Sequence, residues 1–135
     1  MAKDVLVTEA LSEQMMSAGA KLVERLDEKG SDVKSAFWLF FTENRTWKLI
    51  IASPLVTSEG PREFYKRVVA ANSLAAAEEP LISLNNIGVT GLENHIVKLL
   101  KFAIGTGSGI SGVRFSRNTI NGYFIDDAYI YRSSS

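Results

Sequence analysis

The first part of the chain has the hydrophobic period of an amphipathic helix. Between residues 8 and 29, apolar residues recur every three or four positions, which places them on one face of a helix. Thr8 is a suitable N-cap, and Gly30 readily adopts the left-handed conformation that ends many helices. The pattern therefore predicts a helix from about Thr8 to Lys29 that packs on a sheet or on a partner.

The next segments alternate between strand and helix patterns. Residues 35–41 are apolar on both alternating faces, which is typical of a central strand covered on both sides. A polar turn then leads to residues 47–52, and the two segments predict a hairpin. We expect Pro54 to end this strand region and Gly60-Pro61 to begin a second helix, with proline at the first helical position.

The second half of the chain continues this alternation. Pro80 is expected to end the second helix, residues 81–89 to form a third strand, and Gly91 to Asn94 to begin a third helix. Asn121-Gly122 is the favoured pair for a tight type I′ turn, so residues 113–120 and 123–131 should pair as a second hairpin. The prediction is one α+β domain over residues 1–135: a mostly antiparallel five-stranded sheet with three helices, in the order α-β-β-α-β-α-β-β.

The second hairpin predicts two faces of different chemistry. If Asn121-Gly122 is the turn, Arg117 lies opposite Asp126 and Arg114 opposite Tyr129. Strict alternation places apolar side chains on a core face, including Phe115 and Phe124, with Arg117 and Asp126 near the turn. Another set shares the second face and is a candidate for ligand binding: Arg114, Ser116, Asn118, Asp127, Tyr129 and Tyr131. The competing interpretation is a solvated sheet face without a ligand.

Composition restricts the classes of function. Fifteen basic and fifteen acidic residues give a net charge of zero, so no broad attraction to nucleic acid or anionic membrane is indicated. The chain has no cysteine, which excludes disulfides and thiolate catalysis and suits a cytoplasmic protein. The longest apolar run, residues 36–41, is too short to span a bilayer. We therefore expect a soluble, cytoplasmic protein without a membrane partner.

Motifs for metal or cofactor chemistry are weak. His95 is the only histidine, no HExxH spacing occurs, and the adjacent Asp126 and Asp127 should point to opposite faces of a strand, so neither a metal site nor a cofactor is predicted. The glycine-rich loop 105–112 follows a helix and contains no lysine, unlike a phosphate-binding P-loop, so a connector is the preferred interpretation over an anion-binding nest.

Two segments resemble a group of small bacterial hypothetical proteins. The first runs from Gly112 through Gly122 and continues in Asp127-Ala128-Tyr129-Ile130-Tyr131-Arg132, and the second joins Ile51-Ala52-Ser53-Pro54-Leu55-Val56 to Gly60-Pro61-Arg62-Glu63. The resemblance covers roughly residues 33–132. It implies a bacterial, cytoplasmic origin and carries no activity or catalytic residue with it.

Two functional hypotheses follow. The leading one is a binding or interaction protein without catalytic activity, with a protein partner or a second copy of the chain; a homodimer is suggested by the apolar surface of the first helix and the two-sided strand. The alternative is a small enzyme acting on a phosphate-containing substrate such as a nucleotide or nucleic acid. For either, the candidate ligand-binding residues are Arg114, Asn118, Asp127, Tyr129 and His95.

Overall fold

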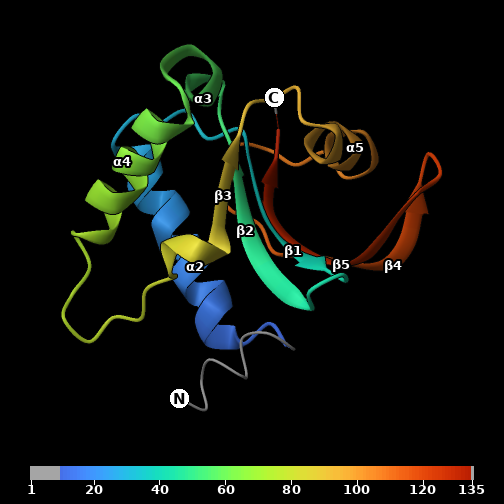
Figure 1. The fold of residues 1–135 in the computed structure, drawn as a ribbon, viewed down its shortest axis with the longest axis horizontal. Helices are drawn as coiled ribbons and strands as arrows, with labels where there is room; N and C mark the ends of the chain where they lie inside the picture. The colour runs from blue at the N-terminus through green and yellow to red at the C-terminus, as the bar shows by residue number, and fades with distance from the viewer. Residues whose placement is uncertain (1–9, 135) are drawn as a thin grey trace.

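One five-stranded sheet organises the molecule. The computed structural model describes residues 10–134, and its strands lie in the order β3-β2-β1-β5-β4 (Figure 1). All neighbouring pairs are antiparallel except β2 and β3, which are parallel. The predicted α+β class and the order of elements are confirmed. The strands are β1 (Ser35–Phe41), β2 (Thr46–Ala52), β3 (Ile87–Thr90), β4 (Val113–Ile120) and β5 (Tyr123–Ser133).

Helices cover both faces of this sheet. Figure 1 shows α2 and α4 on one side and α5 on the other, with the β4–β5 hairpin extending past α5. None of the helices in the described part of the chain is long and apolar enough to cross a membrane. The helices are α2 (Glu13–Glu28), α3 (Pro54–Glu59), α4 (Pro61–Asn72) and α5 (His95–Ala103).

The first helix is shorter than its apolar pattern predicts. Residues 10–12 are not helical, and the Ser12 hydroxyl caps the helix by accepting a hydrogen bond from the Met15 backbone N–H at 3.1 Å. Glu13 follows this cap in the first turn, where a negative charge is favourable. The predicted cap Thr8 lies outside the described residues. The predicted end is confirmed, since Gly30 has a φ of 69°.

Three boundaries in the middle of the chain also differ from the prediction. Pro54 does end β2, but it also begins the six-residue helix α3, which Ser53 caps by accepting a hydrogen bond from the Leu55 N–H at 3.1 Å. The predicted strand over residues 81–89 is reduced to β3, because only residues 87–90 pair with β2. The residues before it form an extended connector and a 3-10 turn, Leu84–Asn86. Helix α4 ends at Asn72, well before Pro80.

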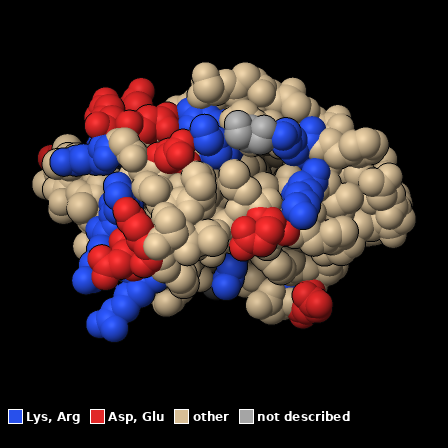
Figure 2. All heavy atoms as spheres, turned by 90° about the horizontal axis from the view of Figure 1, so that it is seen from above, with Lys and Arg blue, Asp and Glu red and all other residues tan. Residues whose placement is uncertain are grey.

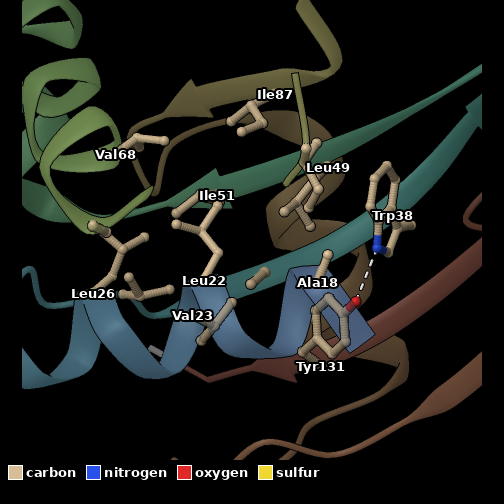
Figure 3. Packing of buried hydrophobic residues seen from close by; sticks show 14 of the residues in the cluster. Ala18, Leu22, Val23, Leu26, Trp38, Leu49, Ile51, Val68, Ile87 and Tyr131 are labelled. Carbon is tan, nitrogen blue, oxygen red and sulfur yellow. Dashed lines mark hydrogen bonds between the residues drawn. The ribbon is translucent and has the colours of Figure 1, made fainter. Parts of the chain in front are cut away.

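The two faces of the sheet form two separate cores. Helix α2 packs Leu22 and Leu26 against Leu49 and Ile51 of β2, and Figure 3 shows these side chains interlocked between the helix and the sheet. On the opposite face, α5 packs with Phe37, which is 0% exposed. Most of the α2 stripe and of β1 is therefore buried within the chain, while Met15, Phe40 and Phe41 are partly exposed. The homodimer stays a prediction, and the two features that suggested it are used mainly in packing within the chain.

Candidate functional site

The β4–β5 hairpin changes face halfway along its length. The predicted register is confirmed, from Ile120 opposite Tyr123 to Arg114 opposite Tyr129. Arg117, however, has a φ of 48°, and Arg117 and Asp126 do not pair. Beyond this point the alternation shifts by one residue on both strands. Ile120 and Ile125 are consequently buried in the α5 core, whereas Phe124, predicted to be in the core, is 58% exposed.

Three of the predicted site residues share the α2 side of the hairpin. Asp127 accepts hydrogen bonds from Nε and Nη2 of Arg114, at 2.7 and 2.6 Å, and from the Ser116 hydroxyl at 2.6 Å. Tyr129 lies between Arg114 on β4 and Trp38 on β1. The two-bond geometry of Arg114 and Asp127 is the strong form of a guanidinium–carboxylate contact.

The electrostatics of this pair keep both groups charged. The hydrogen bond to Asp127 raises the pKa of Arg114 above its already high ordinary value. Partial burial by itself would raise the pKa of Asp127, but hydrogen bonds from Arg114 and Ser116 outweigh it and lower that pKa. Neither group is poised to exchange a proton near neutral pH. Chemically, the pair is a fixed, charged recognition group rather than an acid or base.

An aromatic notch borders the ion pair. Phe40 and Trp47 are cross-strand partners with ring centroids 5.3 Å apart, and the guanidinium carbon of Arg114 lies 5.6 Å from the centre of the Trp47 ring. The hollow beside them has a volume of about 420 Å³. Its walls are Phe40, Trp47, Ser116, Arg117, Asp126 and Asp127.

The notch contradicts one prediction about the two aspartates. Asp126 and Asp127 both line it, although strict alternation places them on opposite faces, because the face change occurs at Asp126. The buried Trp47 indole N–H, in a residue only 2% exposed, has no hydrogen-bond partner. Within residues 10–134, no group of three His, Asp or Glu side chains is placed to hold a metal ion.

The other two predicted site residues lie elsewhere. Asn118 pairs with Ile125, and because cross-strand partners share a face, it belongs to the α5 side of the sheet. His95 is the first residue of α5, and its ring packs edge-on against Tyr123 with centroids 5.5 Å apart. The structure therefore does not bring Asn118 or His95 together with Arg114 and Asp127.

The glycine-rich loop 105–112 is a connector tied to the end of β5. Thr106 and Ser133 exchange two hydrogen bonds, and the Ser111 N–H donates to the Tyr131 carbonyl at 2.6 Å. Arg132 donates to the Gly109 carbonyl, while its terminal nitrogens hold both carboxylate oxygens of Asp27 at 2.8 and 2.9 Å. Arg132 is 4% exposed, so this arginine fastens the loop and α2 to the sheet rather than facing a ligand.

Surface charge supports no large electropositive region on the face that can be seen from above. Figure 2 shows Lys and Arg interspersed with Asp and Glu there, with no field of one sign. This agrees with the net charge of zero. This face, with its charges of mixed sign, does not provide the continuous basic groove that holds nucleic acid.

Comparison with known protein families, with curated proteins and with solved structures gives no match. The resemblance to small bacterial hypothetical proteins, and the cytoplasmic location that it implies, remain predictions.

Proposed function

We propose that this chain is a binding protein without catalytic activity, and that it recognises a protein partner through the exposed side of the β4–β5 hairpin. This hairpin face consists of Arg114, Ser116, Phe124 and Asp127. The observation that supports this proposal most strongly is the Arg114–Asp127 ion pair, which lies beside the aromatic notch. Its two side chains are 48% and 24% exposed. Arginine and aromatic residues are the side chains most enriched at the energetic centres of protein interfaces.

The position of β4 strengthens the case for a protein ligand. Among the strands of residues 10–134 it lies at the edge of the sheet and pairs only with β5, so no described strand pairs with the backbone groups on its outer side. The left-handed residue Arg117 interrupts this edge and leaves residues 113–116 as a short ladder. An extended segment of a partner can pair with that ladder while its side chains reach the hairpin face.

The geometry favours binding over the alternative of an enzyme acting on phosphate. Asp127 already occupies the guanidinium of Arg114, so the charge that would hold a phosphate is neutralised. His95, the one histidine of the chain, lies at the start of α5 beside Tyr123. The residues needed for proton transfer and for phosphate binding are thus not assembled in one place.

Native mass spectrometry of the untagged protein, purified gently from its cells, tests the proposal. We expect either a heterocomplex or a multiple of the 14.8 kDa chain. The double variant Arg114→Ala/Phe124→Ser should lose that complex. The control variant Lys66→Ala/Val69→Ser, which likewise removes one cation and one apolar side chain at exposed positions of α4, should keep it.

Three outcomes contradict the proposal. They are a bare monomer from gentle purification, a complex that the hairpin variant retains, and turnover of a phosphate substrate that Arg114→Ala abolishes. The last outcome replaces the binding function with the enzymatic one.

A further inference from the structure

The two edges of the sheet differ in how they are covered. At the β3 edge, α4 contacts the strand, and the Tyr65 hydroxyl donates to the Ile87 carbonyl at 3.0 Å. At the β4 edge, no strand of residues 10–134 lies beyond the ladder of residues 113–116. An edge left in this way is the part of a sheet that most readily adds a further strand.

The open ladder of β4 carries no net charge that would select a charged partner. Val113 and Phe115 are half-buried on the α5 side, where they pack against the core of that face. Arg114 and Ser116 are exposed on the other side, where both donate hydrogen bonds to Asp127. Because the one cation of the ladder is already neutralised, the ladder favours neither a basic nor an acidic segment.

A second copy of the chain fits the ladder because the pattern is its own complement. Two antiparallel β4 strands related by a two-fold axis perpendicular to the sheet place residues of the same face opposite each other. An axis through Phe115 puts this residue opposite its own copy and puts Arg114 opposite Ser116 of the partner subunit. An axis through Arg114 would instead set two guanidinium groups opposite each other, which is unfavourable.

Preorganisation also favours a second copy over an extended peptide. A free peptide loses conformational entropy when it becomes a strand, whereas the β4 edge of a second copy is already held in place by β5. Each contact of a two-fold interface occurs twice. This doubling compensates for the short ladder, which ends where Arg117 becomes left-handed.

We propose that the partner of the hairpin is a second copy of the chain, and that two β4 strands pair antiparallel about Phe115, joining two five-stranded sheets into one. This inference rests on the proposed function, because it names the partner of the same hairpin. The interface uses neither the stripe of α2 nor the two-sided strand β1.

Charges at the two-fold position test the pairing. Phe115→Lys and Phe115→Glu each set like charges opposite each other and remove the pair of rings. Each should therefore weaken dimerisation of the purified chain at least about tenfold, measured by analytical ultracentrifugation. An equal mixture of the two variants should recover the dimer, because unlike charges then meet. The control changes Val69→Lys and Val69→Glu, at an exposed position of α4 at the other end of the sheet (Figure 1), should leave the dimer unchanged.

Hydrogen exchange of the unmodified protein provides a measurement that does not depend on how the variants fold. The backbone amides of residues 113–116 should exchange more slowly as the protein concentration rises through the range in which the dimer forms. The amides of α4 should show no such dependence.

Several outcomes overturn the inference: a dimer that both charge variants retain, a mixture of the folded variants that stays monomeric, or exchange at residues 113–116 that does not depend on concentration. The purified chain could also be a monomer while protein from its own cells carries a different partner that Arg114→Ala/Phe124→Ser removes. In that case the second copy is wrong, and the hairpin face remains a binding site. A monomer from both sources contradicts both proposals.

Discussion

The two hairpins of this protein share an antiparallel pairing but differ in composition and in surroundings. The β1–β2 hairpin lies inside the sheet, with α2 and α4 on one face and α5 on the other, and Phe37, Trp38 and Leu49 are at most 1% exposed. The β4–β5 hairpin forms one edge, and its tip extends past the helices (Figure 1). There, Tyr123 and Phe124 are 42% and 58% exposed. Strand composition and coverage by helices therefore agree: the apolar hairpin is covered on both faces, and the more polar one lies at the edge.

This contrast teaches where the molecule has room for function. In the buried hairpin, side chains are held by packing on both faces, so almost any change is felt as stability. In the edge hairpin, alternating polar and apolar residues present an ion pair, an aromatic notch and a backbone edge that none of the described strands covers. Changes there should alter binding while leaving the fold intact.

The same substitution in the two hairpins gives the largest expected difference. Phe37→Ala removes a fully buried ring and should lower the free energy of unfolding by about 3–5 kcal/mol. Phe124→Ala removes a ring that is 58% exposed and should change it by no more than about 0.5 kcal/mol. Urea unfolding of both variants, followed by circular dichroism, measures the two values.

Equal losses in the two variants would break the comparison. A large loss for Phe124→Ala would mean that the hairpin tip is buried in solution. Mass measurement of that variant would then show whether a second copy of the chain covers it.

Much of the fold was predictable because local signals agree with the tertiary structure. Asn121-Gly122 set the register of the second hairpin correctly, since the turn needs positive φ and these residues have φ of 49° and 82°. The extent of β3 was not predictable in this way. Only the edge of β2 determines which residues of the long connector pair as a strand.

A close contact between α2 and β5 provides a second, smaller test of how the buried side is packed. A Cβ atom at Gly19 would overlap the Tyr131 ring. This ring cannot move away, because its hydroxyl is hydrogen-bonded to Trp38 and to Met16. Alanine favours a helix over glycine by about 1 kcal/mol, but overpacking costs about 1–3 kcal/mol. Gly19→Ala should therefore destabilise the protein by about 1 kcal/mol net, measured by thermal unfolding.

The sign of this effect should reverse when the ring is removed. In a Tyr131→Ala background, Gly19→Ala should become stabilising, because only the helix preference remains. Ser17→Ala on the exposed face of α2 is the control and should stabilise slightly in both backgrounds. A stabilising Gly19→Ala in the otherwise unchanged chain would show that the α2–β5 contact is looser than described.

The candidate site was only partly predictable. Arg114, Asp127 and Tyr129 share a face as expected, but Asn118 does not, because the backbone at Arg117 adopts a left-handed conformation that residue type does not announce. One signal was present in the spacing of the apolar residues. Phe115 and Ile120 are five positions apart, and Ile125 and Ala128 are three apart. In a regular strand such odd spacings put the two residues on opposite faces, so both can enter one core only if the strand changes face between them. Phe40 and Trp47 joined the site from another hairpin, which no local pattern reports.

The ion pair on the hairpin face should contribute least to stability, and its contribution should depend on pH. A double-mutant cycle with Arg114→Met and Asp127→Asn should give a coupling of about 0.3–1 kcal/mol, because Arg114 is about half exposed and solvent screens the pair. The pKa of Asp127 is lower in the folded protein than in the unfolded chain. The unfolded chain therefore binds the proton first as the pH falls. The stabilisation is fully present above the ordinary aspartate pKa of about 3.9 and is lost as the pH falls through the folded value.

Asp127→Asn should accordingly lose less stability between pH 7 and pH 3 than the unmodified protein does, measured by urea unfolding at both values. Glu13→Gln, on the exposed start of α2 and outside the pair, is the matched control. This variant should still show the loss of stability at low pH that is due to Asp127. If the coupling is zero while Arg114→Ala still removes the bound partner, the pair acts in recognition alone. A coupling well above 1 kcal/mol would instead place the hairpin face among the structural elements, and it would remove the contrast between the two hairpins.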